Sequence, residues 1–202
     1  GVNAGNSITS NGNYNTVVGD EAGTALTTGD ANVAIGFKAL FTENAHGHNV
    51  AIGSGALQRQ DAGADGYNVA IGSSVGTQIT TGLRNTLIGG LAGDALTDAD
   101  DNVALGNSAL SSDTLGSRSV AIGKEALFSQ TFTSATNTYN TAVGAFAGNA
   151  VTTGVNNTLI GGQAGDHITT GASNVAVGYD ALGDTTTGGD NTAVGELALS
   201  NN

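Results

Sequence analysis

The sequence contains no cysteine, proline, methionine or tryptophan, and only five of its 202 residues are lysine or arginine. Without cysteine there are no disulfides and no redox indication of compartment. Without proline, every residue keeps a backbone donor for strand ladders. The cations are Lys38, Arg59, Arg84, Arg118 and Lys124, scattered singly in a chain of net charge −12. Binding to a phosphate backbone needs clustered cations, so we expect no nucleic-acid partner.

Long apolar runs are also missing. None approaches the roughly 20 residues that a bilayer span requires, so we expect no membrane insertion. Charged residues make up only 11% of the chain, which leaves a surface of Asn, Thr, Ser and Gly. The three histidines fall in variable segments without the partners of a catalytic triad, and we expect no enzymatic activity.

Glycine, in contrast, is abundant at 33 residues, and much of it belongs to a phrase that recurs eleven times. The phrase is Asn, then Thr or Val, a small or aliphatic residue, Ile, Val or Leu, and Gly. It begins at Asn15, Asn32, Asn49, Asn68, Asn85, Asn102, Ser119, Asn140, Asn157, Asn174 and Asn191. The spacing is 17 residues, except for one interval of 19 and one of 21. Such a fixed period indicates a repeat architecture.

Each phrase alternates in the manner of a short strand, with β-branched residues on one face and Ala and Gly on the other. A tight turn is expected at the closing glycine, followed by a second short strand and a second turn. The turn glycines are Gly19, Gly36, Gly53, Gly72, Gly89, Gly106, Gly123, Gly144, Gly161, Gly178 and Gly195. We predict an all-β, fibrous fold: a parallel β-solenoid or β-roll of eleven repeats over residues 15–202, with a partial first repeat at 1–14.

The asparagine that opens each unit has a structural interpretation. If the same residue lies one coil away, each side-chain amide donates to and accepts from its neighbours, which forms a ladder along the axis. Asparagine also tolerates the left-handed backbone that strand corners need. Ser119 interrupts this predicted ladder once and should weaken it locally.

A second pattern lies inside the repeat. Counting the asparagine as zero, position eight is either Gly or Leu. Gly-type units carry an aliphatic residue three positions later, at Leu26, Ile79, Leu96, Val151 and Ile168. In Leu-type units we assign a polar residue to that place instead: Asn44, Asp61, Asp113, Gln130 and Thr185. One large side chain per unit is thus predicted to fill the interior from either of two places.

The two unit types follow the order Gly, Leu, Leu, Gly, so that the full period is four units. Two units per coil would alternate Leu and Gly along each column and let large and small residues interdigitate, and we favour that arrangement over one unit per coil. The longer units, with loops at 58–67 and 128–139, lie four units apart and should bulge on one side of the rod.

The phrase Asn-Val-Ala-Ile-Gly at residues 32–36, 49–53 and 68–72, followed by Ala at position seven, resembles the head repeats of trimeric autotransporter adhesins. It is equally similar to the Asn-Thr-Ala-Ile-Gly repeats of phage tail fibres and bacterial surface fibres. The resemblance covers residues 15–199. It implies a left-handed parallel β-roll, three chains about one axis, and a surface that binds host matrix or cells. Those heads use shorter repeats and lack the Thr-Thr-Gly segment and the four-unit period found here.

From these features we expect a rod segment of an extracellular, cell-surface or virion fibre, self-associating as a homotrimer or an end-to-end filament. The alternative is an adhesin that binds a cell-surface glycan or protein through its lateral loops. A minor alternative is a calcium-binding or ice-binding solenoid. The threonine pairs occur in only about half of the units and point to opposite faces, which argues against ice binding.

Asp94, Asp98, Asp100 and Asp101 form the densest acidic cluster, and calcium is the natural ion for oxygen-rich loops. The cluster lacks the glycine and the terminal glutamate of an EF-hand and does not recur from coil to coil. We therefore favour a solvated acidic edge over a calcium site, and expect no cofactor.

His46 and His48 share one face if their segment is extended, so a surface metal site is the alternative there. Zinc sites need three or four ligands, and the sequence shows only these two at that place. A solvated corner is the favoured interpretation.

Overall fold

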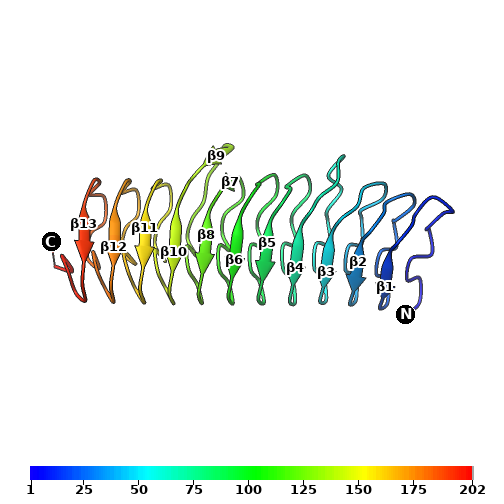
Figure 1. Cartoon of the computed structure of the whole chain (residues 1–202), viewed down its shortest axis with the longest axis horizontal. Helices are drawn as coiled ribbons and strands as arrows, with labels where there is room; N and C mark the ends of the chain where they lie inside the picture. Colours follow the sequence, from blue (N-terminus) through cyan, green and yellow to red (C-terminus); the bar gives the residue numbers. More distant parts are fainter. Residues whose placement is uncertain (202) are drawn as a thin grey trace.

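A computed structural model describes residues 1–201 as one elongated parallel β-solenoid, without a helix in that range and hence without one that could cross a membrane (Figure 1). Asn202, the last residue of the predicted array, lies outside the described residues. The strands are β1 (Thr16–Val18), β2 (Val33–Ile35), β3 (Val50–Ile52), β4 (Val69–Ile71), β5 (Thr86–Ile88), β6 (Val103–Leu105), β7 (Gly116–Ser117), β8 (Val120–Ile122), β9 (Thr136–Asn137), β10 (Thr141–Val143), β11 (Thr158–Ile160), β12 (Val175–Val177) and β13 (Thr192–Val194).

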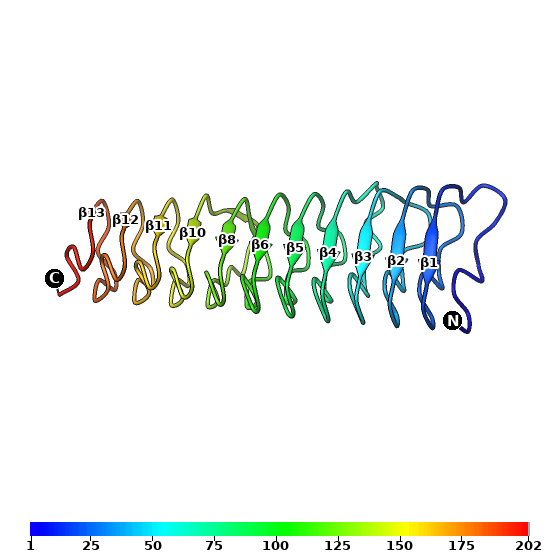
Figure 2. The ribbon, with the colours of Figure 1, turned by 60° about the horizontal axis from the view of Figure 1, so that its bottom comes forward.

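One coil holds one repeat, and the predicted two repeats per coil are wrong. All strands except β7 and β9 form a single eleven-stranded sheet, ordered as they occur in the chain. Each strand pairs in parallel with the strand of the next unit, so that Val33, Ala34 and Ile35 lie beside Val50, Ala51 and Ile52. Figure 2 shows the strands in one row along the rod.

The interior accommodates large and small residues between successive coils, which removes the argument for paired units. All position-eight leucines and position-eleven aliphatics of coils one to ten are fully buried, as predicted. A Cβ at Gly76 would lie 3.1 Å from Leu57 Cδ2 of the preceding coil and 3.0 Å from Leu87 Cδ1 of the following coil. Leucines thus reach across the space left by the glycine.

A third source of interior volume is the middle residue of the strand. This residue is Ala in most strands, but it is Leu87 in β5 and Leu159 in β11, both fully buried. Each lies in the second coil of a Gly-type pair, where no neighbouring position-eight leucine precedes it. Leu87 approaches the Cβ position of Gly93 to within 3.0 Å, so it fills the space above a second consecutive glycine.

The predicted second strand does not form, because the backbone of each coil is left-handed at several points. Positive φ occurs at the residue before the asparagine and at positions four, six and eight. At position eight φ is 54° for Gly76 and 47° for Leu57, so glycine and leucine share one conformation. Left-handed geometry costs a leucine roughly 1–2 kcal/mol. Its full burial stabilises by about 1.5–3 kcal/mol, which offsets that cost.

The asparagine itself is not left-handed, contrary to the corner role considered for it. The residue before it is, with φ of 55° at Ala31 and 58° at Arg84. The turn therefore ends at the residue that precedes the phrase, and the asparagine begins the extended strand.

The position-four glycines form a column in which backbones of successive coils touch. Their φ values lie between 126° and 140°, a range that side chains rarely adopt. A Cβ at Gly89 would lie 2.5 Å from the carbonyl oxygen of Gly106 in the next coil. Only glycine fits both the backbone and the space.

We expect Gly89→Ala to lower the free energy of unfolding by at least about 3 kcal/mol, because it combines backbone strain with a clash against backbone that cannot move aside. The neighbouring Gly90→Ala is the matched control, since a Cβ there meets only the Asn107 side chain at 3.4 Å. Thermal unfolding followed by circular dichroism measures both. Equal midpoints for the two variants would contradict the packing described here.

The two longer units extend the coil at the same point of its circumference. Figure 1 shows the 58–67 and 128–139 loops rising on the same side of the rod, as predicted. The larger loop contains β9, which pairs in parallel with β7 of the preceding coil. Residues 1–14 form no strand but continue the path of the coil beyond β1. Two backbone hydrogen bonds hold them to the first full coil: Gly5 N–H donates to Ala22 O at 3.0 Å, and Glu21 N–H donates to Val2 O at 2.9 Å.

Candidate functional site

The ladder asparagines from Asn32 to Asn174 are fully buried, Asn15 and Asn191 are partly buried, and they link each coil to the next. Asn85 Oδ1 accepts the backbone N–H of Asn102 at 3.0 Å. Its Nδ2 donates to Ala99 O, fourteen residues along the same coil, at 2.8 Å, and to Asn68 Oδ1 at 3.2 Å. One amide therefore forms a hydrogen bond within its own coil and one to each of the two neighbouring coils.

The same bond from a backbone N–H to Oδ1 of the preceding coil recurs along the rod at 2.8–3.1 Å. It joins Asn32 to Asn15, Asn49 to Asn32, Asn68 to Asn49, Asn85 to Asn68, Ser119 to Asn102, Asn157 to Asn140, Asn174 to Asn157 and Asn191 to Asn174. Direct amide–amide bonds are fewer, so the ladder is mainly a chain of contacts between side chain and backbone.

Ser119 leaves a gap in the ladder, and two residues of the long unit fill it. Ser119 Oγ lies 2.6 Å from Thr138 Oγ1, which accepts the Asn140 N–H at 3.4 Å. Gln130 Nε2 donates to Ser119 Oγ at 2.8 Å, and Gln130 Oε1 accepts from Asn140 Nδ2 at 2.9 Å. Thr138 and Gln130 together thus replace the missing amide.

Buried polar residues occupy position eleven of the Leu-type coils. They are Glu43, Gln60, Asp113, Gln130 and Thr185, the first four of them with no exposed surface. Glu43 and Gln60 each come one residue before the Asn44 and Asp61 named from the sequence. In these coils the leucine fills the apolar interior, and the first four of these side chains form hydrogen bonds with the backbone, with the ladder or with one another.

Asp113 shows such a carboxylate fully bonded. Its Oδ1 accepts the backbone N–H groups of Thr114 at 2.8 Å, Gly116 at 3.2 Å and Phe132 at 3.2 Å. Its Oδ2 accepts from Gln130 Nε2 at 2.6 Å. Four donors stabilise the buried carboxylate.

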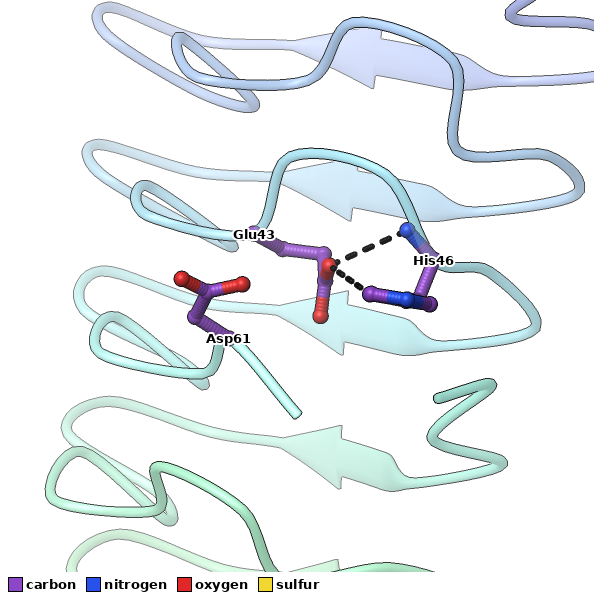
Figure 3. A group of neighbouring side chains, drawn as sticks. All are labelled: Glu43, His46 and Asp61. Carbon is purple, nitrogen blue, oxygen red and sulfur yellow. Dashed lines mark hydrogen bonds and ion pairs between the residues drawn. The ribbon is translucent and has the colours of Figure 1, made fainter. Parts of the chain in front are cut away.

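Glu43, four units earlier, is bonded on one side only. Its Oε1 accepts the backbone N–H groups of Asn44 at 3.1 Å and His46 at 3.2 Å, whereas Oε2 is buried without a partner among the described residues. Burial raises the pKa of Glu43, and the nearby carboxylate of Asp61 adds to this rise, against the lowering by the His46 backbone. One oxygen each from Glu43 and Asp61 and one ring nitrogen of His46 lie within 4.8 Å of one another (Figure 3).

The four aspartates considered for calcium do not converge on one centre. Arg84 binds Asp101 through Nε at 2.6 Å and Asp100 through Nη2 at 3.1 Å. The Arg84 hydrogen bond lowers the pKa of Asp101. Asp98 accepts from Thr81 Oγ1 at 2.6 Å. Asp94 Oδ1 is buried without a hydrogen-bond partner among residues 1–201, and burial raises the pKa of Asp94.

The two histidines considered together have different partners. His48 stacks on Tyr67 with ring centroids 4.8 Å apart, and its Nε2 lies 3.8 Å from Asp65. His46 instead lies beside Glu43. The position-eleven Glu43 and the next-coil Asp61 were not recognised as its neighbours from the sequence.

No pocket is found on the surface of residues 1–201. Comparisons with protein-family models, with curated proteins and with solved structures find no match for this chain. The solenoid and its side-chain clusters are therefore the basis for inferring function.

The ladder carries a quantitative prediction. Asn85→Ala leaves the Asn102 N–H and the Ala99 carbonyl without their partners in the interior, at about 1–3 kcal/mol each. We expect a loss of about 2–4 kcal/mol in unfolding free energy. Asn107→Ala is the control, because Asn107 is exposed on its coil and donates only to Gly90 O at 3.1 Å. Thermal unfolding measures both variants. A lower unfolding midpoint for Asn107→Ala than for Asn85→Ala would overturn the assignment.

Proposed function

We propose that this chain is a structural rod segment of an extracellular, cell-surface or virion fibre. The observation that supports the proposal most strongly is the continuity of one eleven-stranded parallel sheet from β1 to β13. At about 4.8 Å per strand, the sheet alone extends about 48 Å along the axis. Each coil is bonded to both neighbours, so the segment transmits load without a hinge between domains.

The outer face of the sheet supports lateral self-association. In each strand of the eleven-stranded sheet the first and third residues point away from the interior. The first residue is Thr or Val, and the third is Ile, Val or Leu. At position three, Leu105 is 42% and Ile160 39% exposed, so the face is not covered by the chain itself. An uncharged, apolar strip of this length is typical of a protein interface. The homotrimer implied by the resemblance to adhesin heads would cover it.

We expect the double variant Leu105→Asp, Ile160→Asp to shift the chain from oligomer to monomer in sedimentation velocity, because two carboxylates would be desolvated at each interface. Leu91→Asp is the matched control, since Leu91 is 43% exposed but lies outside the strands. The control should leave the sedimentation coefficient unchanged. A wild-type chain that is monomeric at all concentrations would contradict lateral association.

The projecting loops favour a second candidate, an adhesin that contacts a cell-surface glycan or protein. Both loops rise above the other turns on one side of the rod, where a partner could reach them (Figure 1). The larger loop exposes Tyr139 at its base, with Arg118 Nη1 donating to Tyr139 Oη at 3.1 Å. Aromatic and guanidinium groups are common in recognition surfaces.

Shortening the 58–67 loop by two residues and the 128–139 loop by four restores the 17-residue spacing in both units. For a rod segment we expect unchanged self-association and unchanged attachment of the parent fibre to cells. Loss of attachment with the oligomer intact would instead support the adhesin. Flow cytometry with labelled fibre measures attachment, and sedimentation velocity verifies assembly.

A further inference from the structure

The cluster of Glu43, His46 and Asp61 spans two coils. Glu43 and His46 follow β2, whereas Asp61 follows β3 and lies within the 58–67 loop. Figure 3 shows the Glu43 carboxylate lying between the Asp61 carboxylate and the His46 ring. Glu43 has no exposed surface, and the side chain of His46 is 28% exposed. Solvent therefore reaches the cluster from the His46 side and from the exposed Asp61.

Both Glu43 and His46 have polar atoms without a hydrogen-bond partner among the described residues. Glu43 Oε2 and His46 Nδ1 are buried and unpartnered. Nδ1 lies 3.4 Å from Glu43 Oε1, but the pair is not aligned as a hydrogen bond. A buried carboxylate oxygen and a buried ring nitrogen left unpaired are costly, and such atoms call for a ligand.

We propose that Glu43, His46 and Asp61 bind a divalent transition-metal cation of the zinc class, which joins the second and third coils. Two ligands at about 2.0–2.1 Å from a tetrahedral zinc are about 3.4 Å apart. His46 Nδ1 lies at this distance, 3.4 Å, from Glu43 Oε1, the oxygen that also accepts the Asn44 and His46 N–H groups. One ligand atom from each of the three residues lies within 4.8 Å of the other two, and Glu43 Oε2, which has no partner among residues 1–201, remains free to bind the ion as well. An imidazole with two carboxylates suits zinc better than calcium or magnesium, which prefer oxygen ligands alone. Three protein ligands leave one position for water.

The chain contains an internal comparison four units further on. There Asp113 takes the place of Glu43, and Gln130 Nε2 closes its second oxygen at 2.6 Å. In the first copy, Gln60 Nε2 donates to Asn49 Oδ1 at 3.0 Å, and Gln60 Oε1 is buried without a partner in the described chain. Gln60 therefore donates no hydrogen bond to Glu43. His46, moreover, replaces a glycine, Gly116, so a ring nitrogen is present only in the first copy.

His167 also lies near two carboxylates, but its Nδ1 has a hydrogen-bond partner, whereas that of His46 has none among residues 1–201. Its Nδ1 lies 3.4 Å from Asp166 and 3.9 Å from Asp184. The same nitrogen is engaged by the carbonyl of Gly183 at 2.7 Å, and the side chain is 62% exposed. That nitrogen is occupied as a donor, so His167 is a matched control for His46.

Isothermal titration calorimetry tests the proposal on the full chain, first stripped of metal with a chelator. Titration with zinc chloride at pH 7.5 should show one site per chain, with no comparable heat from calcium or magnesium chloride. Altering even the outer partners of metal ligands weakens affinity by about 10–100-fold. We therefore expect Glu43→Gln and His46→Gln to weaken zinc binding at least that much, and His167→Gln to leave it unchanged.

Folding is controlled separately. Glu43→Gln keeps an oxygen that can accept the Asn44 and His46 N–H groups, and Asp61→Asn changes an exposed residue, so both variants should retain the wild-type circular dichroism spectrum. Cobalt(II) substitution provides a second readout, since its visible bands should appear with the wild type and vanish with Asp61→Asn. The proposal is overturned if the wild type binds no zinc, if these variants bind it as tightly, or if His167→Gln abolishes binding.

Discussion

The buried asparagine amide is the interaction on which the coil depends. A primary amide offers an acceptor oxygen and two donor hydrogens in one plane, and Asn85 uses all of them. Its oxygen binds the next coil, and its nitrogen binds the previous coil and a carbonyl fourteen residues along its own coil. The last bond determines where the chain must return, and it forms in the 17-residue units, whereas in the 19-residue unit Asn49 Nδ2 donates to Gly47 O instead. Aspartate would lack the donor, and serine is too short to reach the carbonyl.

Ser119 shows how strict this requirement is. The unit that lacks the asparagine is also the longest, and its additional residues include Thr138, whose hydroxyl accepts the Asn140 N–H. Gln130 supplies the remaining donor and acceptor. The hydrogen bonds of the ladder are thus retained although serine replaces the asparagine. The 128–139 loop therefore has an internal role: it supplies the hydrogen bonds that Ser119 lacks. It also projects on the outside of the rod.

Much of the fold could be predicted from the sequence because the repeat phrase encodes local structure. The strand, the glycine turn and the buried leucine at position eight follow from alternation, backbone permissiveness and volume. The prediction of two units per coil was wrong, because Leu87 and Leu159 fill the paired-glycine coils from a third place that the two-source pattern left out. The second strand failed because left-handed residues such as Glu21 and Lys38 carry ordinary side chains and give no composition signal.

The polar clusters were harder to predict, since they depend on contacts between coils. Asp100 and Asp101 looked like an acidic cluster, but Arg84, sixteen and seventeen residues earlier, lies directly beside them. Glu43 and Asp61 are eighteen residues apart in the chain and adjacent across one coil boundary. A sequence pattern read within one unit cannot identify such pairs, whereas the same residues compared at matching positions of successive units can.

The leucines at the middle of β5 and β11 make the coils non-interchangeable. Inserting or removing a single coil would leave an unpaired unit, or three successive units of one type, and would separate Leu87 or Leu159 from the pair of glycine coils that it fills. Recombination between units would keep the interior filled only when it moves four coils together. Arrays of this kind should therefore change length in steps of four coils, about 19 Å each. The packing of the core thus restricts which lengths the rod can adopt during evolution.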